Sequence, residues 1–449
     1  MRTTGRQRDG SSLHLHYHLA IFDGSLAARI DQVLERDPDA SGRDIRKQFN
    51  TLIAQPLHLT TARRAPIFFV IDALDECEED GATSILTLLA HESPRIPGLK
   101  IFVTTRPERH IRSALVQWHD HTQFHMQDIE QSVVEADIHR YLESRLSESG
   151  VRRSFPEVRF RPWQPTTEQL KILVGMSGKL FIIARTAADF ILDPRHAQPA
   201  KRIATLLDGV SATAFSSSKH SIIMDDVYMR IIRAAQPDPV DDWDYWFRTI
   251  VGAIVLLHDP LSCESLANLL GIDADRIVRT LSNLHSLLAP SKGDSTFRVH
   301  HKSFPDFICD RNRCRMGPAF YIEPTLHHMM VAECCLRVMC DNLKLNICNL
   351  PRNDWSKDQD QLRDRIHNSI PQHLAYACTY WGSHLVSGLG TELGWNNDLC
   401  RVLEHFATQQ LLNWVEAIGF IGRVDTAFSS LEAVVGAMVC QFIPISSIY

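Results

Sequence analysis

The chain has 449 residues, of which 44% are hydrophobic and 22% are charged, and its formal net charge is −6 at pH 7. This length predicts more than one domain, and the composition is that of an ordinary soluble globular protein. The net charge gives no reason to expect a nucleic-acid partner. No apolar run reaches the roughly 18 residues that a membrane-spanning helix needs. We therefore expect a cytoplasmic protein that binds neither nucleic acid nor membrane.

The eleven cysteines are odd in number, and no two have the C-x-x-C spacing of a zinc ribbon. Reduced and mostly buried thiols are therefore expected.

The first part of the chain alternates helical patterns with short apolar runs. Residues 12–60 predict helices, and an apolar run at 67–71 predicts a strand buried within a parallel sheet. A helix at 81–92 separates this run from a second strand at 99–104, and residues 122–125 suggest a weaker third strand. Strands that are joined by helix-length crossovers pair in parallel.

Beyond residue 130 the patterns are almost wholly helical. Val134, Ile138, Tyr141 and Leu142 recur at the spacing of one helix face. The expected fold class is α/β plus α: a partial parallel-sheet P-loop NTPase domain, a helical domain, a winged helix and a C-terminal helical domain. The expected boundaries are 1–130, 131–236, 240–315 and 320–449.

Three carboxylates follow the first predicted strand. Asp72, Asp75 and Glu76 come directly after Ile71, at the end of the strand where parallel α/β sheets place their ligands. Carboxylates beside a dry sheet are costly unless a cation or hydrogen bonds satisfy them. Magnesium, held by carboxylates and phosphates, is the usual cation in nucleotide-binding proteins. These residues therefore predict a magnesium–nucleotide site.

The second predicted strand ends in Val103-Thr104-Thr105-Arg106-Pro107. In a nucleotide-hydrolysing site one carboxylate holds magnesium, a second orients the attacking water, and a polar or cationic residue on the neighbouring strand contacts the terminal phosphate. Arg106 has the position of this last residue. The two strand ends together indicate a nucleotide-hydrolysing site far more specifically than either strand end alone.

With these motifs the chain resembles the NACHT class of STAND signal-transduction NTPases, and in particular the fungal NOD-like-receptor relatives. The resemblance rests on Ile-Asp-Ala-Leu-Asp-Glu and Thr-Thr-Arg-Pro, and it continues over roughly residues 17–436. Later segments that match are Asp137–Leu142, Gly178–Ala184, the winged-helix signature H-x-S-F-x-D-F at His301–Phe307, Tyr376–Trp381 and Leu411–Glu416.

The resemblance implies roles for five residues. Asp72 would bind Mg²⁺, Asp75 and Glu76 would be the acidic hydrolytic pair, and Arg106 would be the sensor on the adjacent strand. His301 matches the winged-helix histidine that reaches the bound diphosphate of ADP in the closed form. The alternative for His301 is a buried histidine satisfied by backbone groups.

The P-loop of this class is missing. Nothing in residues 1–65 matches G-x-x-x-x-G-K-[ST], and Gly178-Lys179 is followed by Leu180 in an apolar helix pattern. We therefore expect a chain truncated within its NTPase domain, by a gene-model error or by real loss, that binds ATP or ADP weakly. Such a sheet would also expose an edge and an apolar face. The C-terminal repeats of fungal relatives are also not found.

Two functions are therefore expected. The first is a NACHT-type NTPase-like switch, impaired by loss of the P-loop, in which ATP hydrolysis is not expected. The second is a non-catalytic interaction module that associates with itself or with full-length relatives and regulates them.

Overall fold

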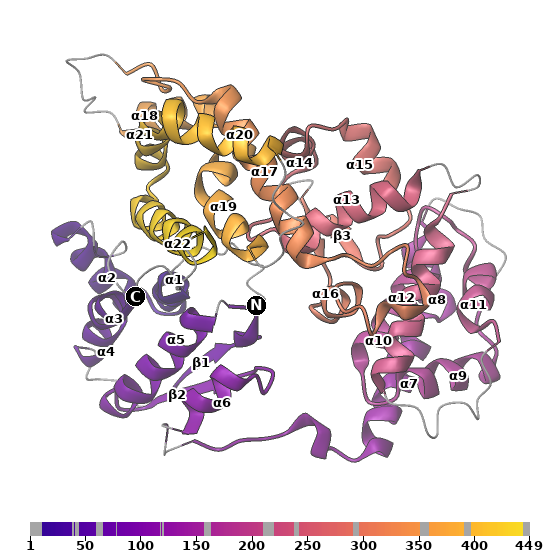
Figure 1. Cartoon of the computed structure of the whole chain (residues 1–449). Coiled ribbons are helices and arrows are strands. Elements are labelled where there is room, and N and C mark those ends of the chain that lie inside the picture. The colour runs from indigo at the N-terminus through magenta and orange to yellow at the C-terminus, as the bar shows by residue number, and fades with distance from the viewer. Residues whose placement is uncertain are drawn as a thin grey trace, which may run out of the picture. The chain divides into compact units, whose positions relative to one another are not determined.

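The computed structural model describes residues 11–37, 40, 45–59, 66–77, 79–116, 118, 121–156, 163–209, 220–237, 242–290, 296–350, 359–389 and 397–442. The chain forms two compact units, residues 1–125 and 126–449 (Figure 1). The domain boundary expected at residue 130 stays a prediction. The finer divisions expected at 131–236, 240–315 and 320–449 lie inside the second unit and stay predictions.

The first unit begins with helices, as predicted. They are α1 (Ser11–Phe22), α2 (Gly24–Arg36), α3 (Ile45–Phe49), a π-helical turn η2 (Asn50–Ala54) and α4 (Gln55–His58). Asp23 starts α2, because its carboxylate accepts a hydrogen bond from the Ser25 backbone N–H at 2.8 Å. Leu26, Ile30, Phe49 and Ile53 contribute to the core of this unit.

The sheet consists of two parallel strands, which confirms the predicted pairing. β1 (Ile67–Ile71) runs beside β2 (Leu99–Val103), with Ile67 opposite Leu99 and Ile71 opposite Val103. Helix α5 (Glu79–Glu92) and a 3-10 turn η4 (Ser93–Arg95) connect the strands, and α6 (Arg109–Val116) follows β2. Figure 1 shows α5 lying along the strand pair.

Only one face of this sheet is buried. This corrects the expectation of a strand buried within the sheet and confirms the expectation of an exposed apolar face. Phe69 is 5% exposed, whereas Phe68 and Val70 are 66% and 64% exposed and Phe102 is 57% exposed. Successive side chains of a strand alternate between faces. The core of this unit lies against the face that carries Phe69 and Leu99, so the other face keeps its apolar side chains in solvent.

The expected third strand is wrong. Residues 121–125 have no regular structure, and Phe124 is 85% exposed. The short apolar–polar alternation there does not pack against the core, and a strand needs such packing to form. A 3-10 turn, η5 (Met126–Asp128), follows.

The second unit starts with a run of helices. Ile138 and Leu142 are fully buried, as the helical spacing predicted. Gly178, at φ 53°, ends the third helix of the run, and Lys179 donates a hydrogen bond to the Ile129 carbonyl at 2.7 Å. The Gly178-Lys179 pair therefore lies in a turn between helices. The helices are α7 (Gln131–Arg145), α8 (Glu148–Ser154), α9 (Thr167–Ser177), α10 (Phe181–Ile191), α11 (Pro199–Leu207) and α12 (His220–Ala235).

A small antiparallel hairpin interrupts the helices of the second unit. β3 (Leu288–Pro290) pairs with β4 (Phe297–Val299), and Ser262 forms an isolated bridge with Thr296. Three helices precede the hairpin and a short helix follows it. They are α13 (Trp243–Leu256), α14 (Cys263–Leu270), α15 (Ala274–Leu281) and α16 (Ser303–Ile308), which leads into a 3-10 turn, η7 (Cys314–Met316).

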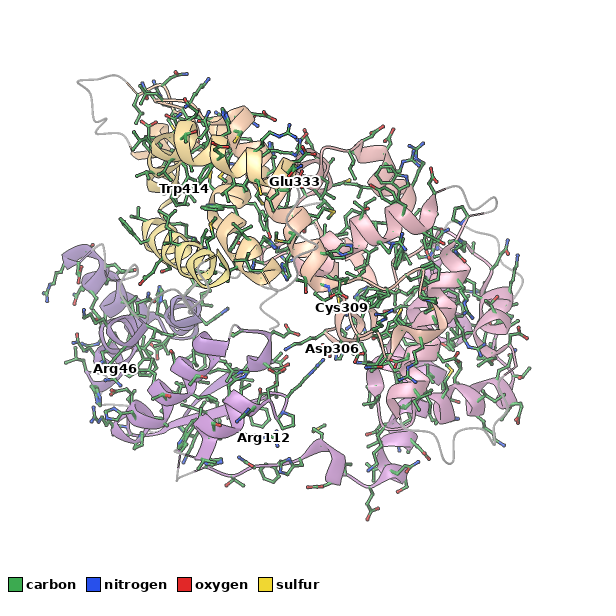
Figure 2. All side chains as sticks on the ribbon, viewed as in Figure 1. Arg46, Arg112, Asp306, Cys309, Glu333 and Trp414 are labelled. Carbon is green, nitrogen blue, oxygen red and sulfur yellow. The ribbon has the colours of Figure 1, made fainter. Side chains whose placement is uncertain are left out.

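The rest of the second unit is helical, and Figure 2 marks Trp414 within it. Trp414 is fully buried, with its ring centroid 6.0 Å from that of Trp381 and 5.9 Å from that of Phe406. No helix in the described residues is long and apolar enough to cross a membrane. The elements are α17 (Pro324–Asn342), α18 (Gln359–Ser369), α19 (Gln372–Gly388), α20 (Asn397–His405), a π-helical turn η9 (Phe406–Gln410), α21 (Leu411–Ile421) and α22 (Val424–Phe442).

The architecture is therefore mostly helical with one small parallel sheet. This arrangement is compatible with the expected α/β plus α class.

Candidate functional site at the end of the parallel strands

The carboxyl ends of β1 and β2 meet at one edge of the sheet. The Thr104 backbone N–H donates to the Ile71 carbonyl at 2.9 Å, which extends the parallel ladder one step beyond the strands. Because parallel strands end at the same side, Asp72 and Thr104 become neighbours although 32 positions separate them. This edge is where the sequence predicted the site.

Thr104 is the centre of the local hydrogen bonding. Its hydroxyl donates to Asp72 Oδ1 and accepts from the Ala73 backbone N–H at 2.8 Å. Its carbonyl accepts from the Leu74 N–H at 2.9 Å. Ala73 has a left-handed backbone at φ 55°, which turns the chain sharply away from the strand. These contacts fix the exposed Asp72 side chain beside the strand ends.

Sequence reasoning gave Thr104 no role. The available signal was a hydroxyl residue directly after the second strand, opposite a carboxylate after the first.

Asp75 is buried and paired with Arg106. It lies in a 3-10 turn, η3 (Leu74–Glu76), and its side chain is only 6% exposed. Asp75 Oδ1 accepts from the Arg106 backbone N–H at 3.0 Å, and Oδ2 lies 3.5 Å from Arg106 Nε. The carboxylate predicted as hydrolytic and the arginine predicted as sensor therefore contact each other. A buried carboxylate needs a compensating cation, and Arg106 supplies one from the chain itself.

Glu76 differs from Asp75 because its side chain is exposed. Its backbone N–H donates to the Ala73 carbonyl at 3.0 Å, which closes the turn. The three predicted carboxylates thus divide into one buried residue, Asp75, and two solvent-facing residues, Asp72 and Glu76. Their chemical roles stay predictions.

The oxygen atoms of Asp72 and Thr104 are of the kind that Mg²⁺ prefers. Among the described residues no group of three or more His, Cys, Asp or Glu side chains could hold a metal ion. The described residues therefore offer two oxygen donors here, Asp72 and Thr104, and no protein cage that would hold a metal ion by itself.

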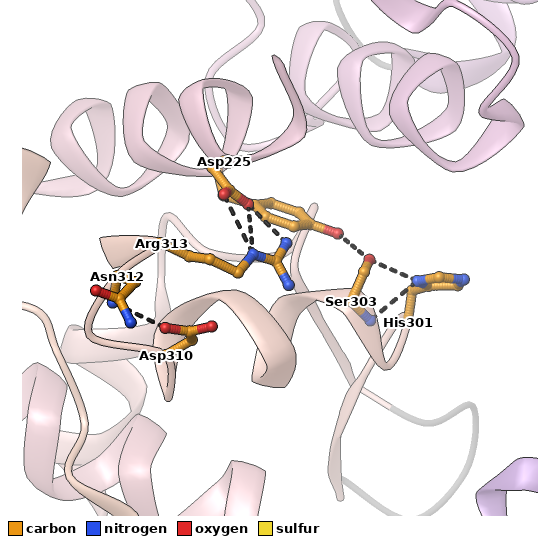
Figure 3. Close-up of polar contacts among 7 residues, drawn as sticks. Asp225, His301, Ser303, Asp310, Asn312 and Arg313 are labelled. Carbon is orange, nitrogen blue, oxygen red and sulfur yellow. Dashed lines mark hydrogen bonds and ion pairs between the residues drawn. The ribbon is translucent and has the colours of Figure 1, made fainter. Parts of the chain in front are cut away.

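His301 belongs to the second unit, where it joins a hydrogen-bonded chain (Figure 3). The Ser303 backbone N–H donates to His301 Nδ1 at 3.1 Å, so Nδ1 is an acceptor and the neutral ring carries its proton on Nε2. Ser303 Oγ lies 2.6 Å from Nδ1 and 2.7 Å from the Tyr228 hydroxyl. Burial raises the pKa of Tyr228, so this phenol remains neutral in the chain.

The alternative for His301 was a buried histidine whose ring is hydrogen-bonded by backbone groups. The structure shows a half-buried ring with one backbone N–H bonded to Nδ1. A role in binding the diphosphate stays a prediction.

A second contact ties α12 to the turn after α16. Arg313 Nη2 lies 2.7 Å from Asp225 Oδ1, and Arg313 Nε lies 3.2 Å from both Asp225 oxygens (Figure 3). The two side chains are 24% and 14% exposed. Burial alone would lower the pKa of Arg313, but the hydrogen bonds and charge of Asp225 raise it above its ordinary value. We call this pair the α12 clamp.

A family model described as Nephrocystin 3, N-terminal, matches residues 6–106. The matched segment contains both strands and ends at Arg106, so it includes Asp72, Asp75, Glu76 and Thr104. No curated protein matches the chain. Over these residues the chain is similar to a family that is adjacent to the NACHT class without being specific to it.

Proposed function

We propose that this chain is a NACHT-type, NTPase-like signal-transduction protein whose nucleotide-dependent switch is impaired. The observation that carries the proposal is the convergence of Asp72, Thr104, Asp75 and Arg106 at the carboxyl ends of two parallel strands. Ligand sites of parallel α/β sheets lie at this edge. The family match over residues 6–106 adds support for the same segment.

We assign a role to each of these residues. Asp72, with the Thr104 hydroxyl beside it, would hold Mg²⁺ on the phosphates of ATP or ADP. Glu76, which is exposed, is better placed than the buried Asp75 to orient a water molecule. Asp75 would position Arg106 near the terminal phosphate.

Binding should be weak because the sequence contains no G-x-x-x-x-G-K-[ST]. Each charge-assisted hydrogen bond that a P-loop supplies contributes about 1.5–3 kcal/mol. Two such losses weaken binding by roughly two to four decades. We therefore expect ATP hydrolysis to be absent or very slow.

A winged helix in the second unit forms part of the proposal. Support comes from the order of three helices, α13, α14 and α15, followed by the β3–β4 hairpin. The isolated bridge between Ser262 and Thr296 adds a short third segment to this pairing. His301 follows the hairpin directly, the position from which the resemblance has it reach the diphosphate.

A second candidate function is favoured by the exposed face of the sheet. Phe68, Val70 and Phe102 are each more than half exposed, and contiguous exposed apolar side chains mark protein-interaction sites. Under this alternative the chain is a non-catalytic module that binds other proteins, either copies of itself or full-length relatives.

Calorimetric titration of the full chain with ATP, with and without Mg²⁺, separates the two. Under the first proposal the wild-type chain binds Mg–ATP weakly, and Asp72→Asn and Thr104→Val lower the affinity roughly tenfold, the loss of one charge-assisted contact. Asp31→Asn, which changes an exposed carboxylate of α2, is the matched control and leaves affinity unchanged.

Equal affinity in the wild type and the Asp72 variant would remove Asp72 from the site. Absence of binding at millimolar Mg–ATP would remove the first proposal and leave the interaction module.

A further inference from the structure

Three histidines from three elements gather inside the second unit. His258 lies in the turn after α13, His328 lies on α17 and His384 lies on α19. The ring centroid of His384 is 4.9 Å from that of His258 and 5.1 Å from that of His328. His384 is fully buried, and the other two are half-buried. We call these residues the histidine cluster.

The contacts of this cluster are all satisfied by one arrangement of protons on neutral rings. The His258 backbone N–H donates to the Tyr376 hydroxyl oxygen at 3.2 Å. The Tyr376 hydroxyl can then donate to His384 Nε2, 2.7 Å away, which leaves the neutral His384 with its proton on Nδ1. That proton is donated to His328 Nδ1 at 2.8 Å. The chain of bonds is complete when both imidazoles are neutral.

Added protons disturb this arrangement. When both imidazoles are protonated, His328 Nδ1–H faces His384 Nδ1–H with only 2.8 Å between the two nitrogens, and the contact becomes repulsive. Burial and the neighbouring imidazoles lower the pKa of His328 to about 4 and hold the pKa of His384 well below its ordinary value. Burial also raises the pKa of Tyr376, so the phenol cannot supply a compensating negative charge.

The groups around the cluster come from each element that packs there. Asp259, beside His258, accepts a hydrogen bond from the Tyr380 hydroxyl at 2.6 Å. On α17, His327 has one ring nitrogen 2.9 Å from the Glu323 carbonyl and the other 3.1 Å from the Arg248 carbonyl of α13. Ser383 has its hydroxyl 2.9 Å from His258 Nε2, and Cys335 of α17 acts electrostatically on Tyr376. Elsewhere on α19, Glu264 of α14 acts on His373, and Ser430 of α22 lies near Gly382.

The helices that the cluster joins approach each other closely. A Cβ atom added to Gly388 of α19 would lie 2.4 Å from the Met329 sulfur of α17. Met329 adjoins His328 in the sequence, so the close approach and the cluster lie on the same pair of helices. Charge introduced between α17 and α19 therefore acts where there is little room to relax.

We propose that the histidine cluster is an acid-sensitive lock that holds α17, α19 and the turn after α13 together while its rings are neutral. As pH falls through the range in which free imidazole takes up a proton, the rings of the separated form become charged, so the free energy that holds the three elements together decreases. The open form is the one that binds more protons, so the lock is complete above pH about 6.5 and weakens below it.

Hydrogen exchange of the full chain at pH 7.5 and pH 5.0 tests the proposal, with each rate divided by the intrinsic rate at that pH. A histidine with a pKa of about 4 in the closed form and about 6.5 in the open form favours opening about 30-fold at pH 5. Protection of α17 and α19 should fall at least this much in the wild type. His328→Gln, which keeps an acceptor that does not titrate, should reduce the fall about 30-fold.

His405→Gln is the matched control, because His405 is an exposed histidine of the same unit. An equal loss of protection in His328→Gln, His405→Gln and the wild type would overturn the proposal.

A spectroscopic measurement on the wild type decides the matter if the His328 variant does not fold. With ¹⁵N-labelled histidine, the His384–His328 bond should give an N–N coupling across the hydrogen bond at pH 7.5, and this coupling should be lost as the pH is lowered through about 4, where His328 of the closed form takes up a proton. No coupling at pH 7.5, or one that persists unchanged at pH 3, contradicts the lock.

Discussion

The α12 clamp allows a quantitative test of how the second unit is held together. Asp225→Asn keeps the size of the side chain and removes its charge, which leaves Arg313 with 24% exposure and no full counter-charge at this site. Breaking a fully buried ion pair costs about 3–5 kcal/mol, and exposed pairs are worth about 0–1 kcal/mol. The intermediate burial of this pair predicts a loss of about 2 kcal/mol in the free energy of unfolding.

Urea unfolding followed by tryptophan fluorescence is a suitable assay, because Trp118 is the one tryptophan outside residues 126–449. Asp225→Asn, Arg313→Gln and the double variant form a cycle whose coupling energy should be about 1–2 kcal/mol. The matched control is Glu148 with Arg152, also an ion pair, whose side chains are 42% and 73% exposed. A clamp coupling no larger than that of the control pair would refute the reasoning.

Two further predictions follow from packing. Gly252→Ala places a Cβ 2.4 Å from the His327 ring and should lower the free energy of unfolding in urea by about 1–3 kcal/mol. Gly419→Ala is the control: its Cβ has nothing within 4 Å, so it should be neutral or stabilising by up to about 1 kcal/mol. Equal effects of the two substitutions would contradict the packing argument. Replacing Phe68 and Phe102 together by Thr should reduce concentration-dependent association, measured by light scattering. The free energy of unfolding should change by less than about 1 kcal/mol, because both side chains are largely exposed. A larger loss of stability would show that this face is covered.

Local patterns predicted the two strands of the parallel sheet, but they also suggested a strand at 122–125 that does not form. The run Ile67–Ile71 is apolar, β-branched and aromatic, and the crossover through α5 permits only parallel pairing with Leu99–Val103. Asp72 and Thr104 follow the two strands, so they lie at the same edge of the sheet, where parallel strands both end. An exposed apolar face was expected from the missing P-loop, but the patterns could not show which side chains it carries, since that depends on which elements pack against the sheet.

The contacts that define the site were beyond sequence reasoning. Asp75 and Arg106 were each identified, but as separate parts of a nucleotide site, and their pairing across 31 positions depends on the turn at Ala73. His328 and His384 are 56 positions apart and lie in ordinary amphipathic helices. Nothing in their local spacing distinguishes them from surface histidines, because their meeting is a product of tertiary packing alone.

The hydrophobic cores of the two units have no residue in common. One gathers buried residues from Leu19 to Ala114, and the other gathers them from Ile138 to Val434. A substitution in one core therefore removes buried contacts of that core alone. An exchange of sequence between genes near residue 125 would leave both cores undivided.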